Sequence, residues 1–92
     1  MPEIQLTVID QSGLHARPAA RFVQAASRFG SRIKIRNGER EADAKSLISL
    51  LGLAVKLSNV ITVAAEGVDA EAALASLTAE LSAYVTPLEQ PS

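Results

Sequence analysis

Two apolar periodicities alternate along this chain, and their order is the feature that most narrows its fold. Apolar and polar residues alternate over Glu3–Ile9 and over residues 32–36, and a β-branched run covers residues 60–65. Each of these stretches predicts a strand. Apolar residues recur at three- and four-residue spacing over residues 16–27 and 70–85, which predicts two amphipathic helices.

Shorter signals complete the order of elements. Asn37-Gly38 predicts a hairpin into a short charged strand over residues 39–42, because both hairpin residues tolerate positive φ. Ser46 is predicted as the N-cap of a short helix that begins at Leu47, and Asp69 as the N-cap of the last helix.

The resulting order is strand, helix, strand, strand, helix, strand, helix, which predicts an α+β domain of two layers. We expect a four-stranded, largely antiparallel sheet with helices packed against it. A chain of 92 residues can bury one hydrophobic core, so residues 1–92 are expected to form a single domain. Residues 86–92 follow the last predicted helix and are expected to form a loose tail.

The composition excludes several classes of site. Without cysteine the chain can form neither disulfides nor thiolate metal sites, and its one histidine cannot build a zinc site alone. We therefore expect neither a metal nor a cofactor.

The N-terminus shows no basic region followed by an apolar one, and the apolar-rich run over residues 47–55 is far shorter than the roughly 20 residues that cross a bilayer. A cytoplasmic protein without membrane insertion is expected.

Charge is unevenly distributed along the chain. Residues 17–56 hold all nine lysines and arginines against three acidic residues, whereas residues 57–92 hold five acidic residues and no lysine or arginine. This pattern is compatible with ordinary solvated faces, and equally with a basic face around Arg17 that steers acidic partners. Aromatic residues are few and no dense basic cluster is present, so nucleic acid is not an expected partner.

The stretch Ser12–Ala19 carries the strongest chemical signal. It holds His15, the only histidine, where a predicted strand gives way to a predicted helix. Pro18 marks the first turn of that helix, whose free N–H groups favour an anion. Backbone N–H groups of Ala16 and Arg17, together with the Arg17 guanidinium, could hold phosphate oxygens beside the imidazole. This arrangement is what a transient phosphohistidine requires. Ser12 is either a turn residue or a further phosphate ligand.

The short helix near residue 47 has apolar residues on more than one face. It is either buried deep in the core, or it leaves Leu47, Ile48 and Leu51 exposed as a patch on which partners dock.

Two motifs together resemble the HPr family, the histidine phosphocarriers of the bacterial sugar phosphotransferase system. The stretch Gly13–Ala19 resembles the active-site signature of that family. Ala44-Lys45-Ser46-Leu47, about thirty residues further on, resembles its second signature. The resemblance spans residues 2–85, and three features between and beyond the signatures also fit it: Asn37-Gly38, Thr62 and Glu66-Gly67.

This resemblance implies a fold and a function. The fold would be an open-faced β-sandwich of βαββαβα order, with a four-stranded sheet under three helices. His15 would accept a phosphoryl group on its δ nitrogen from phosphorylated enzyme I and pass it to EIIA domains of sugar permeases, with Arg17 beside the group. The protein would be a carrier rather than an enzyme, and a monomer.

Ser46 corresponds, by the same resemblance, to the serine that HPr kinase/phosphorylase modifies in many bacteria. The kinase and a transcriptional regulator would then be further partners. An N-cap role alone also accounts for a serine at this position. Ser46 is therefore expected either to be a regulatory phosphorylation site or to be a cap without regulatory use.

The chain departs from the family pattern at Ala54 and Ser58, where glycines are usual after the second helix, so that turn is expected to differ. Two other classes of function remain open at this point. One is a small phosphatase of the acylphosphatase kind, and the other is a regulatory binding protein in which only Ser46 matters.

Overall fold

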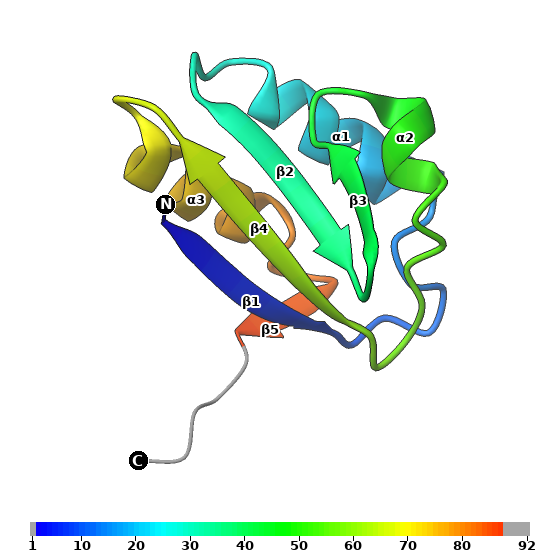
Figure 1. Cartoon of the computed structure of the whole chain (residues 1–92). Coiled ribbons are helices and arrows are strands. Elements are labelled where there is room, and N and C mark those ends of the chain that lie inside the picture. Colours follow the sequence, from blue (N-terminus) through cyan, green and yellow to red (C-terminus); the bar gives the residue numbers. More distant parts are fainter. Residues whose placement is uncertain (1, 88–92) are drawn as a thin grey trace.

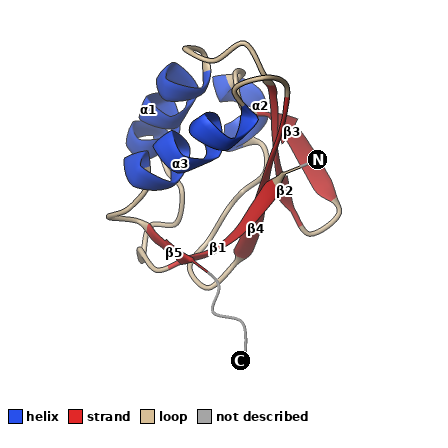
Figure 2. Cartoon of the chain, turned by 90° about the vertical axis from the view of Figure 1, so that its left-hand side faces the viewer, coloured by secondary structure: helices blue, strands red, loops and turns tan. Residues whose placement is uncertain are grey.

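The computed structural model describes residues 2–87 and shows an α+β domain in two layers (Figures 1 and 2). Three helices, α1, α2 and α3, cover one face of a sheet whose other face is open. The helices span Ala16–Ala26, Leu47–Leu51 and Ala70–Glu80. In the part of the chain that is described, no helix is long and apolar enough to span a membrane.

The sheet has five strands in the order β3-β2-β4-β1-β5, and each neighbouring pair is antiparallel. The strands span Glu3–Val8 (β1), Arg32–Asn37 (β2), Arg40–Asp43 (β3), Val60–Glu66 (β4) and Val85–Pro87 (β5). The α+β class, the antiparallel sheet and the three helices are therefore confirmed. The expected strand number of four is wrong, because β5 adds a fifth strand beside β1.

The strand β5 also corrects the predicted end of the last helix. Helix α3 ends at Glu80 and not near Val85, and the chain turns over residues 81–84 before it joins the sheet. Val85, Thr86 and Pro87 pair with Val8, Thr7 and Leu6, so three residues of the sheet fall where the sequence predicted helix or tail. Pro87, which has no N–H to donate, is the last residue of this edge strand. The rest of the predicted tail, residues 88–92, lies outside the described residues.

The core lies between the sheet and the helices. Alternate residues of the strands face it, and helices α1 and α3 contribute Phe22 and Leu77. Each such side chain stabilises the fold by about 1.5–3 kcal/mol when fully buried. The largest fully buried strand residues are Leu6, Val8, Ile33, Ile35, Ile61 and Val63.

The predicted hairpin connects β2 and β3, with Asn37 paired to Arg40. Only Gly38 has positive φ, at +64°, which is the pattern of a type II′ turn. Asn37 has a different role from the one its turn propensity suggested: its amide donates to the Leu53 carbonyl oxygen at 3.1 Å. The hairpin is thereby tied to the loop that follows α2.

Candidate functional site

His15 is the N-cap residue of α1, between the predicted strand and the predicted helix. Its backbone is extended, with φ −81° and ψ −176°, and its carbonyl oxygen accepts the helix hydrogen bond from the Ala19 N–H at 3.1 Å. The imidazole makes no capping hydrogen bond and is exposed to solvent. The first turn therefore has N–H groups that can donate hydrogen bonds to an anion held beside the imidazole.

Arg17 and Ala16 form the exposed side of that first turn, while Pro18 and Ala19 are buried and anchor it. The one ion pair found among residues 2–87 joins Lys34 and Glu41 at 3.6 Å, far from Arg17 in the sequence and on the sheet. The Arg17 guanidinium is therefore not engaged in an ion pair within the described chain. It can turn toward a phosphoryl group on the neighbouring side chain.

The turn before α1 is fixed by Gly13. This residue has φ +64°, and a Cβ here would collide with the Val55 carbonyl oxygen and lie 2.8 Å from the Lys56 Cα. The next residue, Leu14, donates its N–H to that same Val55 oxygen at 3.1 Å. The turn that carries His15 is thus docked directly on the loop of residues 52–59. The sequence motif includes Gly13 but does not predict this close backbone contact.

Ser12 is exposed in the same turn. Its N–H donates to the Asp10 carboxylate at 2.8 Å, while the Gly13 N–H donates to the Asp10 carbonyl oxygen at 2.9 Å. These bonds give Ser12 a structural role in an Asx-type turn. Its role as a phosphate ligand stays a prediction.

The loop of residues 52–59 shows why the departures from the family pattern are relevant. Ala54 and Ser58 both have left-handed backbones, with φ +51° and +72°. Each of these residues therefore has a backbone conformation that favours glycine, at a cost of roughly 1–2 kcal/mol. Hydrogen bonds hold the loop in place: the Ser58 N–H donates to the Val8 carbonyl oxygen at 2.9 Å, and the Lys56 N–H to the Asn59 side chain at 2.8 Å.

Tyr84 is the aromatic neighbour of His15. The two ring centroids lie 6.1 Å apart with the planes at 84°, an edge-to-face arrangement. The apolar spacing over residues 70–85 predicts that Tyr84 is part of the last helix, so the sequence does not predict this contact. No local signal could have found it, since it depends on where α3 ends and β5 begins.

Helix α2 combines the two alternatives that the sequence left open. Leu50 is buried and Leu47 is half-buried against the core, whereas Ile48 is 86% exposed and Leu51 is 39% exposed. The exposed part of the predicted patch is therefore Ile48 and Leu51, with Leu47 largely at its base. Ser46 is the N-cap of α2, and its hydroxyl oxygen accepts the Ser49 N–H at 3.3 Å.

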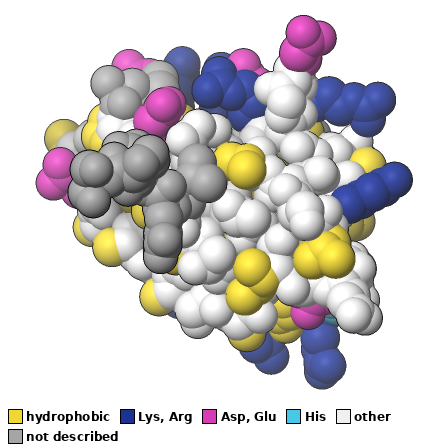
Figure 3. Space-filling view, turned by 90° about the horizontal axis from the view of Figure 1, so that it is seen from below, with side chains coloured by type: hydrophobic (Ala, Val, Ile, Leu, Met, Phe, Trp, Pro, Cys, Tyr) yellow, Lys and Arg dark blue, Asp and Glu magenta, His cyan; other side chains and the backbone are white. Residues whose placement is uncertain are grey.

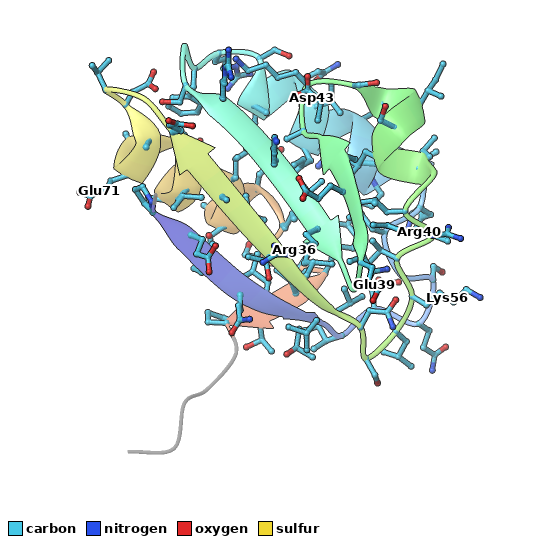
Figure 4. The ribbon with its side chains drawn as sticks, viewed as in Figure 1. Arg36, Glu39, Arg40, Asp43, Lys56 and Glu71 are labelled. Atoms are coloured by element: carbon cyan, nitrogen blue, oxygen red, sulfur yellow. The ribbon has the colours of Figure 1, made fainter. Side chains whose placement is uncertain are left out.

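The lysines and arginines of residues 17–56 are divided between the two layers of the molecule. Some project from α1, and others from the open face of the sheet, where Arg36 is seen in Figure 4. Arg40 reaches the Gly52 carbonyl oxygen at 3.4 Å, while Lys56 projects into solvent from the loop before β4 (Figure 4). Seen from below, Lys and Arg side chains project from the margins, and hydrophobic side chains form separate groups between them (Figure 3).

Among the described residues, no group of three or more histidine, aspartate or glutamate side chains is arranged to hold a metal ion. The site therefore consists of an exposed imidazole, a helix N-terminus and one arginine. These groups can form and stabilise a phosphorylated histidine.

Comparison with known proteins decides the family. The sequence profile described as "PTS HPr component phosphorylation site" matches residues 2–83, which is almost the whole chain. This protein belongs to the HPr family. An HPr phosphocarrier protein of Lysinibacillus sphaericus is 41% identical over 78 residues, covering 85% of this chain and 89% of the relative. A multiphosphoryl transfer protein of Xanthomonas campestris is 48% identical over 73 residues, which is 79% of this chain and 9% of that protein.

Solved structures of HPr proteins share the fold. The histidine-containing phosphocarrier protein of a Mycoplasma has a TM-score of 0.85 at 32% identity, covering 87% of this chain and 91% of that one. HPr-C-His from Thermoanaerobacter tengcongensis has the same TM-score at 38% identity, covering 90% and 93%. The predicted open-faced β-sandwich of the family is confirmed, with the fifth strand as an addition to the predicted sheet.

Membership of this family confirms the predicted function in outline. The protein is an HPr phosphocarrier of the phosphotransferase system, a cytoplasmic component and not itself an enzyme. The phosphatase alternative is thereby wrong. Enzyme I and EIIA domains are the partners that the family implies.

Proposed function

We propose that His15 is the residue that carries the phosphoryl group, accepting it from phosphorylated enzyme I and passing it to EIIA domains of sugar permeases. A lone pair on the imidazole, on the δ nitrogen by the family resemblance, forms the new N–P bond. The bond from phosphorus to the donor breaks, and the donor leaves with that electron pair. The observation that supports this role is the imidazole at the N-terminus of α1, which is exposed and makes no capping hydrogen bond.

The phosphoryl oxygens are held by the N–H groups of Ala16 and Arg17 and by the Arg17 guanidinium. A helix N-terminus stabilises an adjacent anion by about 0.3–1 kcal/mol at an exposed site. So modest a stabilisation suits a carrier, because the group must leave as readily as it arrives. The Ser12 hydroxyl, exposed three residues before His15, is a further ligand in this proposal.

The partners dock on the exposed apolar side chains of α2 beside the site. Ile48 and Leu51 present that surface, with Leu47 at its base, and α2 packs against α1, which begins at the site. Enzyme I and the EIIA domains must each reach His15, so they use this surface in turn. For this reason the proposal takes the carrier as a monomer, which sedimentation at micromolar concentration tests.

The test of the carrier role is phosphotransfer followed by mass. The protein is mixed with bacterial enzyme I, phosphoenolpyruvate and magnesium. We expect one acid-labile phosphoryl group in the wild type and none in His15→Ala. Arg17→Ala is expected to slow transfer roughly tenfold, the effect of losing about 1.4 kcal/mol of charge-assisted binding. Arg36→Ala, which removes an exposed cation from the sheet, is the matched control and should transfer normally. An unchanged mass in the wild type with an active control carrier contradicts the proposal.

Ser46 supports a second, regulatory part of the proposal. A phosphate here, added by HPr kinase/phosphorylase, carries about −1.5 to −2 charge. It would lie next to the exposed Ile48 and weaken docking of acidic partners, while offering a new surface to a transcriptional regulator. The half-buried Ser46 hydroxyl already caps α2, so phosphate at this N-cap need not unfold the helix.

Ser46→Asp tests the regulatory part by adding one negative charge at the same position. We expect transfer from enzyme I to slow roughly tenfold, as like charges face each other in the complex. Gln5→Glu is the control, because it adds one charge on an exposed residue of β1. Equal rates for both variants would exclude an effect of charge at Ser46.

A further inference from the structure

The ring of Tyr84 lies beside the imidazole of His15, and the two rings are arranged edge-to-face. The imidazole makes no capping hydrogen bond to α1, so the contact with Tyr84 is its clearest restraint within the described chain. An aromatic pair in this geometry attracts more than its buried area alone would provide. The orientation of the His15 ring therefore depends on where the Tyr84 ring lies.

Tyr84 is itself held in place by the backbone around it. Its N–H donates to the Leu81 carbonyl oxygen at 2.8 Å, and its own carbonyl oxygen accepts the Ile9 N–H at 2.8 Å. Its side chain is half-buried against the core, and the next residue, Val85, is paired with Val8 in the sheet. The turn between α3 and β5 thus presents the ring from a fixed position.

We propose that Tyr84 is a positioning residue for phosphoryl transfer, which orients the His15 imidazole before the donor arrives. This inference rests on the proposed role of His15. Transfer requires the reacting nitrogen lone pair to be aligned with the phosphorus atom and with the bond that breaks to the donor. Restricting rotation of the imidazole in the free protein removes part of the entropic cost of that alignment. Tyr84 acts through its aromatic ring, and its hydroxyl is not required.

Three variants distinguish the effect of the Tyr84 ring from the effect of its hydroxyl and from a general loss of stability. Tyr84→Phe keeps the ring, and Tyr84→Leu keeps apolar volume without an aromatic edge. Phe29→Leu is the matched control, because Phe29 is also a partly buried aromatic residue packed against the core, but it follows the far end of α1. Each variant is first checked for a wild-type pattern of backbone NMR signals away from the substituted residue.

Two measurements are made on each variant. The first is the rate of transfer from phosphorylated enzyme I at limiting carrier concentration. We expect Tyr84→Leu to be about three- to tenfold slower than wild type, the range that one aromatic pair provides, and Tyr84→Phe and Phe29→Leu to be within twofold. The second is the NMR shift of the His15 ring protons without phosphate, which is expected to move in Tyr84→Leu alone.

The outcomes are distinguishable. A wild-type rate in Tyr84→Leu overturns the proposal, as does an equal slowing in Phe29→Leu or in Tyr84→Phe. Unmoved His15 ring signals in Tyr84→Leu show that the rings are not in contact in solution, which also overturns it. Absence of phosphorylation in the wild type instead contradicts the carrier role of His15, and the ring signals then still test the contact.

Discussion

Gly13 is constrained both by its own backbone and by its neighbour. Its φ of +64° disfavours any residue with a Cβ, and that Cβ would also collide with Val55. Gly13→Ala is therefore expected to lower the free energy of unfolding by about 2–5 kcal/mol, the sum of left-handed strain and overpacking. It should also slow phosphotransfer, because the turn that carries His15 must move away from the loop of residues 52–59.

Gly38 provides the matched control for that prediction. Its φ is also +64°, but a Cβ there would meet no atom within 4 Å. Gly38→Ala should therefore show only the left-handed strain, about 1–2 kcal/mol, with normal phosphotransfer. Urea unfolding of both variants gives the comparison, and equal losses would mean that the contact with Val55 contributes nothing.

Ala54 and Ser58 allow a prediction of the opposite sign. Both have positive φ without being glycine, so Ala54→Gly and Ser58→Gly should each stabilise the protein. The relief of about 1–2 kcal/mol is partly offset by the larger entropy of glycine in the unfolded chain, which leaves roughly 0.5–1 kcal/mol. The same change at Ala75, exposed within α3, should instead cost about 1 kcal/mol. Thermal unfolding distinguishes the two signs, and a loss at Ala54 would contradict the left-handed backbone.

At the scale of elements, the structure depends on a strand that local signals hide. Val85 is 4% exposed and pairs with Val8, whereas the exposed Thr86 pairs with Thr7. Val85→Ala is expected to lower the free energy of unfolding by about 1–3 kcal/mol, and Thr86→Ala by less than about 0.5 kcal/mol. Denaturant unfolding of the two variants measures this difference. If residues 85–87 were an unpaired tail, neither substitution would have an effect.

The sequence predicted the elements whose signals are local. Strand alternation around Leu6, the first helical turn marked by Pro18 and the Ser46 N-cap each depend on residues within one turn or one strand, and all three predictions are confirmed. The end of α3 was not found, because the apolar stripe continues to Tyr84 as if the helix did. Only pairing with β1, some eighty residues away, makes Val85 a strand residue.

The same limit applies to the candidate site. His15, Ala16 and Arg17 are adjacent in the chain, so the rules of helix starts place them correctly. Tyr84 reaches His15 through tertiary structure alone, and the close contact of Gly13 with Val55 is equally invisible to local patterns. The sequence thus places His15 at the helix start, but it does not show that Tyr84 and Val55 lie against this turn.

At the scale of the whole molecule, the Asp69 carboxylate joins two segments that are far apart in the sequence, the start of α3 and the loop between α1 and β2. Asp69 is the N-cap residue of α3 as predicted, but its side chain makes no capping bond. It accepts hydrogen bonds instead from the N–H groups of Gly30 and Ser31, at 3.0 Å each, and from the Ser31 hydroxyl. These hydrogen bonds hold the pKa of Asp69 below its ordinary value of 3.8, and the bond from the Ser31 hydroxyl has the largest effect. The start of α3 is thereby tied to the loop between α1 and β2.

This lowered pKa predicts how stability depends on acid. Because the folded protein binds the Asp69 proton less tightly than the unfolded chain does, the ionised group stabilises the fold above about pH 4. That contribution is lost as pH falls from about 4 through the folded-state pKa. Asp69→Asn is therefore expected to unfold at lower urea than wild type at pH 7, with the difference shrinking below pH 4. Glu71→Gln, which removes a carboxylate from the first turn of the same helix, is the control. Only the ionised carboxylate accepts all three hydrogen bonds. A difference in urea midpoint between wild type and Asp69→Asn that stays constant from pH 7 to pH 2 would therefore show that the carboxylate does not join α3 to the loop between α1 and β2.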